Sequence, residues 1–187
     1  FLARTHMALE HDEEAEKVLQ ETLQQFGPDK WVHYYLATIY ESRDRIKEAE
    51  KHLKACLELD PLDPEVMNFL GYMYAEEGIE LDEAERLLHK ALELDPNNGF
   101  YLDSLGWVYY RKGEAGRAID LIRRAILNMK TDDATLREHL GDAYLLSGTV
   151  DKAVSQWKRA LQLDPTLEGV QEKLDKFSRK KPHSATP

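Results

Sequence analysis

The sequence predicts an all-α protein, built as an array of antiparallel helical hairpins, because three sets of residues recur with one shared period. Members of each set lie 34 or 35 positions apart, and such a period is typical of helical repeat proteins. The sets are the prolines that close Leu-x-Leu-Asp-Pro strings (Pro61, Pro96 and, two periods later, Pro165), the second residues of Leu-Ala or Leu-Gly pairs (Ala37, Gly71, Gly106, Gly141), and a row of alanines (Ala15, Ala49, Ala84, Ala118, Ala153).

Each period reads as two helices joined by a short turn. In one period the apolar residues have helical spacing from Leu102 to Tyr109 and again from Ala118 to Ala125, and the polar residues 111–114 interrupt the pattern. The Asp-Pro pairs close the units, because the residue before a proline is disfavoured in the helical conformation. Glycine inside a helix costs about 1 kcal/mol relative to alanine, so Gly71, Gly106 and Gly141 are expected to permit close approach of a neighbouring helix.

These residues resemble the tetratricopeptide repeat family, whose 34-residue unit carries a Leu-Gly pair, a Tyr three residues later, a later Ala and a closing Pro. The resemblance covers residues 1 to about 165 and implies a right-handed α-solenoid superhelix. In this fold the first helix of each unit lines the concave surface. One unit shows the match in full, at Leu70, Gly71, Tyr74, Gly78, Ala84, Leu88, Ala91 and Pro96. The tyrosines at the Tyr74 position of successive units are expected to pack in the core; they are Tyr40, Tyr74, Tyr109 and Tyr144.

The repeat divides the chain into successive units. A final amphipathic helix is expected to cap the stack, with Val170, Leu174 and Phe177 inward and Glu168, Glu172, Lys173 and Lys176 outward. The first unit is expected to be truncated, with Phe1 to about Leu9 supplying the end of its first helix, which predicts further repeats upstream. The divisions are a partial repeat at 1–29, full repeats at 30–63, 64–98, 99–133 and 134–165, the capping helix at 166–180 and a disordered tail at 181–187.

Composition narrows the classes of function. The 187 residues carry 35 acidic and 25 basic side chains, a formal net charge of -10, and no long apolar run that would span a membrane. An acidic chain is a poor candidate for nucleic-acid binding, which depends on clustered Lys and Arg. The single cysteine, Cys56, identifies no redox compartment.

The sequence contains no motif of a known catalytic, metal or cofactor site. It has no His-Glu-x-x-His, Gly-x-Ser-x-Gly, phosphate-binding glycine loop or Cys-x-x-Cys motif. Seven histidines are scattered without the i, i+4 pairing of a helical metal site, so they are interpreted as surface or groove residues. We therefore expect a protein that is not an enzyme and needs no cofactor.

The resemblance also predicts which side chains line the groove. Positions two, five, nine and twelve of each first helix give a set with aromatic residues at its centre. The family subclass that clamps a terminal carboxylate with Lys, Asn and Arg is not matched, and only Asn68 resembles it. Aromatic anchors flanked by acids instead favour a basic amphipathic segment of a partner. The predicted partner-binding residues are Tyr34, Thr38, Asn68, Tyr72, Phe100, Asp103, Trp107, Tyr110, Glu138 and Asp142.

The preferred interpretation is a non-catalytic scaffold or adaptor that binds a protein or peptide partner in this groove. Two alternatives stay open: a module for homo-oligomerisation through Phe1 and Leu2, and a regulatory domain of a larger protein. The chain looks like bacterial multi-repeat proteins, many of which are envelope lipoproteins or periplasmic adaptors. The sequence does not distinguish envelope or periplasm from cytoplasm, and it does not identify the partner.

Overall fold

A computed structural model describes residues 12–178, and these residues form ten helices and no strand. Consecutive helices pair as antiparallel hairpins, α3 with α4, α5 with α6, α7 with α8 and α9 with α10. The bounds are α2 Asp12–Phe26, α3 Lys30–Glu41, α4 Ile46–Leu59, α5 Pro64–Glu77, α6 Leu81–Leu94, α7 Gly99–Arg111, α8 Ala115–Asn128, α9 Ala134–Leu146, α10 Val150–Leu163 and α11 Val170–Ser178.

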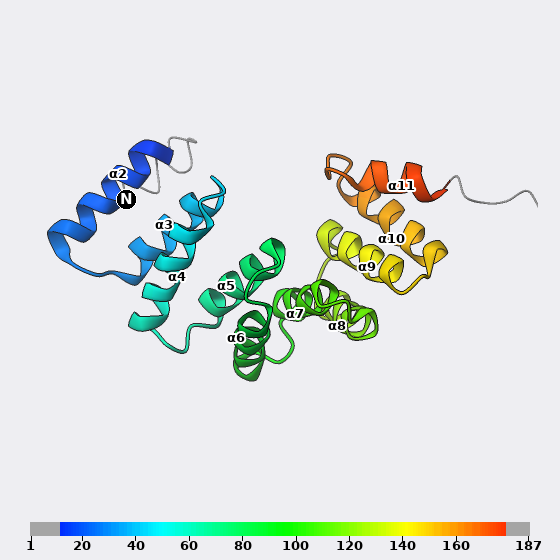
Figure 1. Ribbon diagram of the computed structural model, residues 1–187, viewed down its shortest axis with the longest axis horizontal. Helices are drawn as coiled ribbons and strands as arrows, with labels where there is room; N and C mark the ends of the chain where they lie inside the picture. The colour runs from blue at the N-terminus through cyan, green and yellow to red at the C-terminus, as the bar shows by residue number, and fades with distance from the viewer. Residues whose placement is uncertain (1–11, 179–187) are drawn as a thin grey trace, which may run out of the picture.

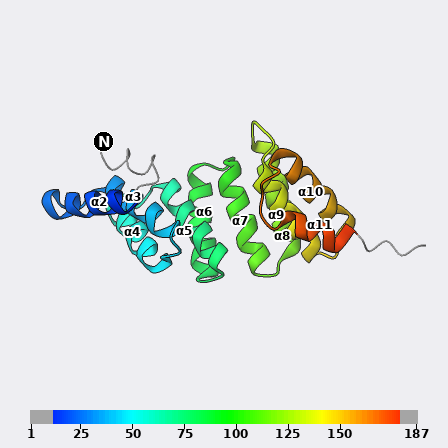
Figure 2. The same ribbon diagram turned by 90° about the horizontal axis from the view of Figure 1, so that it is seen from above.

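The helices form an α-solenoid that follows the chain from one end to the other. Figure 2 shows them in a row in sequence order, and Figure 1 shows that the row bends, so that both ends rise on the same side. At the middle of the bend α6 lies on the outer side of α5 (Figure 1). The predicted hairpin ranges 30–63, 64–98, 99–133 and 134–165 each contain one helix pair.

The first helix of each hairpin begins at a polar capping residue. The side chains of Asp29, Asp63, Asn98 and Asp133 each accept hydrogen bonds from backbone N–H groups two or three residues later. These N–H groups have no partner within the helix, so the caps fix where the helices α3, α5, α7 and α9 start. The recurring Asp and Asn residues therefore set the register of the groove-lining helices.

A glycine on each of three first helices permits close contact within its hairpin. A methyl group added to Gly106 would lie 2.6 Å from Cγ1 of Ile122 on α8, and one added to Gly71 would lie 2.9 Å from Cγ of Leu88 on α6. The same substitution at Gly141 would meet the indole ring of Trp157. The sequence-based expectation of close helix approach at these glycines is confirmed.

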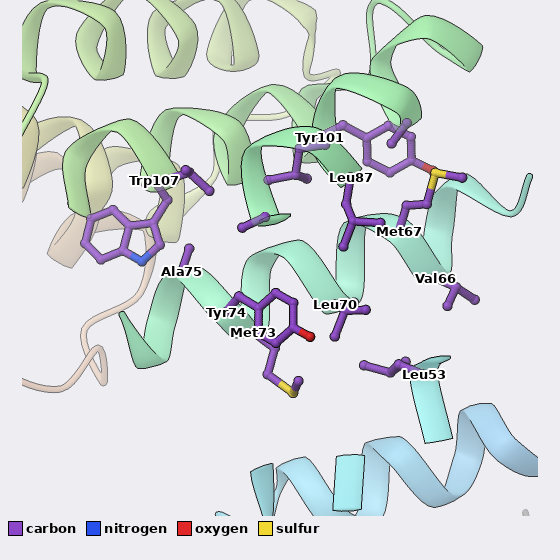
Figure 3. Close-up of a cluster of buried hydrophobic side chains, with 14 of the residues drawn as sticks. Leu53, Val66, Met67, Leu70, Met73, Tyr74, Ala75, Leu87, Tyr101 and Trp107 are labelled. Atoms are coloured by element: carbon purple, nitrogen blue, oxygen red, sulfur yellow. The ribbon is translucent and has the colours of Figure 1, made fainter. Parts of the chain in front are cut away.

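The core is continuous across hairpins. Figure 3 shows Leu53 of α4, Leu70 and Tyr74 of α5 and Trp107 of α7 within one cluster. Tyr74 donates a hydrogen bond to Glu50 of the preceding hairpin at 2.8 Å, and Tyr109 does the same to Glu85 at 2.7 Å. Three of the four tyrosines expected in the core are buried, while the fourth is half-buried; the buried ones are Tyr40, Tyr74 and Tyr109, and the fourth is Tyr144.

Helix α11 covers the end of the array. Val170 and Leu174 are buried against Trp157 of α10, as expected, and Phe177 lies half-buried with its ring 5.8 Å from the Trp157 ring. The expectation that Lys173 faces outward is wrong, because its Nζ lies 2.8 Å from Glu138 and 2.7 Å from Asp142 on α9. The predicted start of the partial repeat at Phe1 to Leu9 and the tail at 181–187 lie outside the described residues.

Candidate partner-binding groove

Three cavities lie along the first helices α3, α5, α7 and α9 and end at α11, and we call this row the groove. Their volumes are about 440, 260 and 410 Å³. The first two share Asn68, Tyr72 and Phe100, so they adjoin each other. Eight of the ten predicted partner-binding residues line these cavities: Tyr34, Thr38, Asn68, Tyr72, Phe100, Asp103, Tyr110 and Asp142.

The cavity nearest the N-terminus has aromatic walls. Tyr34 of α3 is half-buried, with its ring edge-on to Phe69 of α5 at 5.7 Å and to Trp31 at 6.3 Å. Phe100 at the start of α7 is 56% exposed, although it borders two cavities. Large exposed aromatic side chains around a concavity are the residues that most often dominate binding at protein interfaces.

The middle cavity, which we call the Asp103 pocket, combines two aromatic walls with polar groups. It is lined by Asn68 and Tyr72 of α5, by Phe100, Asp103 and Ser104 of α7, and by Asp133, Thr135 and Leu136 around the start of α9.

Unsatisfied buried polar atoms cluster at the predicted site. Within residues 12–178, three buried side-chain atoms have no hydrogen-bond partner: Asn68 Oδ1, Asp103 Oδ1 and Trp107 Nε1. All three belong to predicted partner-binding residues. Because most buried polar groups in proteins are paired, this concentration marks α5 and α7 as the polar centre of the groove.

A stack of three rings lies beside the Asp103 pocket. The Trp107 ring stacks on Tyr110 at 4.4 Å and on His139 of α9 at 4.1 Å between ring centroids. His139 Nδ1 donates to Asp103 Oδ2 at 2.8 Å, and both side chains are buried. Trp107 is 7% exposed and lines none of the three cavities, so its indole packs between Tyr110 and His139 and is not part of the groove surface.

Burial and charge act in opposite directions on His139. Burial alone would lower the pKa of His139, but the Asp103 carboxylate, through its charge and its hydrogen bond, raises it above the ordinary value, with smaller contributions from Glu76 and Glu138. Burial, followed by the charge of Glu76, also raises the pKa of Tyr72. The carboxylates of Asp103, Glu76 and Glu138 are therefore close enough to His139 to favour its charged form.

Acids in the C-terminal part of the groove are already paired. Asp142 accepts a hydrogen bond from Trp157 Nε1 at 2.9 Å on one oxygen and from Lys173 on the other. Glu138 also contacts Lys173 and lines none of the three cavities. Of the three acids in the predicted site, Asp103 is the one with a buried carboxylate oxygen that has no hydrogen-bond partner.

Sequence reasoning missed His139, Phe69 and Lys173 as parts of this region. His139 and Phe69 occupy the sixth position of their units, which is not among the positions two, five, nine and twelve from which the groove was predicted. No sequence pattern indicated that Lys173 reaches α9.

Other candidate reactive groups within residues 12–178, Cys56 and the pair of His33 and His52, contact neighbouring groups of the protein. No group of three or more metal-ligating side chains is present in this range, and none of its helices has the length and apolar character to cross a membrane. Cys56 is buried, its Sγ donates to the Lys30 carbonyl at 3.3 Å, and burial raises the pKa of its thiol to about 12. His33 and His52 meet through their Nδ1 atoms at 2.8 Å.

Comparison with known proteins agrees with this architecture. Family models described as tetratricopeptide repeat match residues 30–76, 80–128 and 104–168. No curated protein sequence gives a significant match.

Solved structures similar to this chain include TTC0263, a thermophilic TPR protein of Thermus thermophilus, with a TM-score of 0.76, 20% identity and 95% coverage of both chains. MamA from Desulfovibrio magneticus gives a TM-score of 0.74 at 15% identity, with 89% of this chain and 93% of that chain covered. A chain of the APC/C hetero-tetramer Cut9–Hcn1 gives 0.83 at 17% identity, with 95% and 35% covered. At these identities the similarity establishes the fold alone.

Proposed function

Because the chain belongs to the tetratricopeptide repeat family, we propose that it is a non-catalytic scaffold that holds an amphipathic segment of a partner protein in the groove. The observation that carries the proposal is the row of three cavities, two of them adjoining, whose walls come from successive first helices and, at the C-terminal end, from α11. An extended or helical segment can contact several units at once, and its apolar side chains can enter the aromatic cavities.

The chemistry of the groove favours binding over catalysis. Its titratable groups are paired with one another, as in Asp103 with His139 and Asp142 with Lys173. Its exposed surface is aromatic, with Phe100 accessible at the junction of two cavities. Aromatic anchors of this kind lose little conformational entropy on binding and bury a large apolar area.

Selection of displayed random peptides tests this proposal even though the partner is unidentified. Enriched peptides would be labelled, and their affinities measured by fluorescence anisotropy for the original chain, for Phe100→Ala and for Phe26→Ala. Both phenylalanines are exposed, at 56% and 77%, so neither substitution threatens the fold, but Phe26 lines none of the groove cavities.

We expect Phe100→Ala to weaken binding at least tenfold, since truncation of an interface anchor costs roughly 1.4 kcal/mol or more. Phe26→Ala should leave the affinity within about twofold. Failure to enrich any peptide, or equal affinity of all three chains, would contradict binding in the groove.

A further inference from the structure

We propose that the Asp103 pocket is a recognition site for one arginine or lysine side chain of the partner segment, an inference that rests on the proposed function. The pocket of about 260 Å³ is smaller than the roughly 300 to 1,000 Å³ of typical small-molecule sites, and its size suits a single side chain.

Two residues that line the pocket carry hydrogen-bond acceptors that the protein itself does not use. Asp103 is 5% exposed, and His139 occupies its Oδ2, while Oδ1 has no partner. Asn68 Oδ1, which belongs to the facing helix α5, is also buried without a partner. A buried acceptor without a donor costs free energy, so a ligand that brings donors to both oxygens is favoured.

Guanidinium and ammonium groups are the side-chain donors that also carry positive charge. The structure favours charge because Asp103 is a carboxylate and because Glu76 and Glu138 add to the negative potential around it. His139 occupies only Oδ2 of Asp103, and Lys173 pairs with Glu138 and Asp142, so Oδ1 of Asp103 is the acceptor that we assign to the cation. A neutral amide donor would gain no Coulomb energy from the charge of this carboxylate.

The walls of the pocket suit the rest of such a side chain. Tyr72 and Phe100 border the pocket, and their rings can cover the methylene stem of an arginine or lysine. An aromatic face also attracts a cation electrostatically, by an interaction that strengthens when water is excluded. One basic residue among apolar neighbours is therefore the sequence signature that we expect in bound segments.

The test uses the peptides selected for binding to the groove and replaces their basic residue. In a selected peptide that contains arginine, this residue would be replaced by citrulline, which keeps the shape of arginine but has a carbonyl oxygen in place of one NH2 group and carries no charge, or by methionine. We expect each replacement to weaken binding to the original chain at least tenfold. In the Asp103→Asn variant the loss on citrulline replacement should fall to about twofold, because the charge that it complements is gone.

Controls separate this inference from the proposed function. Glu21→Gln removes an acid on α2, outside the groove cavities, and should retain the full citrulline effect. If Asp103→Asn does not fold, the citrulline and methionine comparisons on the original chain still decide the question.

Three results would overturn the inference. They are equal affinity of the arginine and citrulline peptides, an unchanged citrulline effect in Asp103→Asn, and enriched peptides without a basic residue. If Phe100→Ala still weakens binding in those cases, the groove proposal stands while the basic pocket falls. If no displayed peptide binds the original chain, both the groove proposal and the basic pocket are contradicted.

Discussion

Gly106 shows how one small residue sets the spacing of two helices. A methyl group at this position would lie 2.6 Å from Ile122 Cγ1 and 3.3 Å from the Ala118 carbonyl oxygen, so the Ile122 side chain or the helix that carries it would have to shift. We predict that Gly106→Ala destabilises the protein by about 1 to 3 kcal/mol, as overpacking of a core does. Gly116→Ala is the matched control, because nothing lies within 4 Å of its added methyl group. It should stabilise the protein by about 0.5 kcal/mol through helix propensity.

Chemical denaturation of the two variants measures this difference. The Gly106→Ala midpoint should shift to lower denaturant concentration and the Gly116→Ala midpoint should not. Equal shifts would mean that the small size of Gly106 is not what the α7–α8 contact requires.

His52 makes folding sensitive to acid. Burial, followed by the charges of His33 and Lys51, lowers the pKa of His52 to about 4, against 6.5 when it is unperturbed. The folded state therefore disfavours the proton, so stability is present above pH 6.5 and is lost as pH falls from 6.5 through 4. Replacement of His52 by Asn should flatten this loss when Tm is measured at about pH 7, 5.5 and 4.5. An acid dependence as steep as that of the original chain would contradict the assignment.

The pKa of His139 is shifted in the opposite direction to that of His52, so the effect of His139 on stability has the opposite dependence on pH. Its pKa is raised because the Asp103 charge and hydrogen bond outweigh burial, so its contribution is fully present below pH 6.5 and is lost as pH rises through the higher folded pKa. We predict that the free-energy difference between the original chain and His139→Asn shrinks as pH increases from about 6 to about 9. Urea unfolding at both pH values measures it, and a difference that grows with pH would disprove the raised pKa.

At the residue level the sequence predicted which side of a helix a residue lies on better than it predicted whether its side chain is exposed. Tyr34, Tyr72 and Phe100 border the cavities as the repeat register implied, because the register depends on helix period alone. Trp107 occupies the same position in its unit as Tyr72 does in the preceding unit, but Trp107 is buried, because His139 of the next hairpin stacks on its ring. Such contacts depend on the residue opposite, which a single unit's sequence does not contain.

At the level of helices, α11 is held by both packing and charge. The Lys173 side chain is 32% exposed, and it contacts Asp142 and Glu138, whose side chains are 9% and 17% exposed. Lys173→Met would leave two largely buried carboxylates without their cation, and we predict a loss of about 2 to 3 kcal/mol. Arg86→Met removes a partner of Glu83 on the exposed surface of α6 and should cost less than about 1 kcal/mol.

Hydrogen exchange locates the effect of these substitutions. Lys173→Met should increase exchange in α11 and in the adjoining α9 and α10, while α3 to α6 keep their protection, because stability in repeat arrays is transmitted between neighbours. If α11 keeps its original protection, its ion pairs contribute little to docking.

The starts of four helices are decided by local chemistry, although their capping residues were not identified from the sequence, and the capping helix predicted at 166–180 is observed at Val170–Ser178. Asp29, Asp63, Asn98 and Asp133 cap their helices through contacts only two or three residues away. The amphipathic pattern of α11 likewise indicated its buried residues Val170 and Leu174. It could not indicate Lys173, whose partners lie 31 and 35 positions earlier on α9.

For the whole molecule, the period predicted an array of helical hairpins, and the family resemblance implied that they stack into a solenoid. Each hairpin leaves an apolar face that only a neighbouring hairpin can cover, and the cluster from Leu53 to Trp107 in Figure 3 is the result. The binding properties are less predictable, because they depend on which charges remain after internal pairing. Asp142 and Glu138 share the single cation Lys173 within the array, while Asp103 has a buried oxygen without a hydrogen-bond partner.

The overall charge of the chain should govern how fast a partner arrives. The net charge is -10, and Glu41, Glu76 and Glu77 are exposed at the ends of the groove-lining helices α3 and α5. Burial, followed by the charges of Glu76 and Glu77, raises the pKa of Glu41, which indicates that these acids are close enough to reinforce one another. A basic peptide would therefore be drawn toward the groove before any contact forms.

We predict that the association rate of a basic groove peptide falls on the order of tenfold between about 0.05 M and 0.5 M salt, while its dissociation rate changes less than about twofold. Glu76→Gln combined with Glu41→Gln should lower the rate at low salt and reduce its salt dependence, whereas Glu21→Gln on α2 should have a smaller effect. Stopped-flow fluorescence measures these rates. If salt acts mainly on dissociation, attraction arises in the bound state, at the Asp103 pocket, and long-range steering by the acidic helix ends is absent.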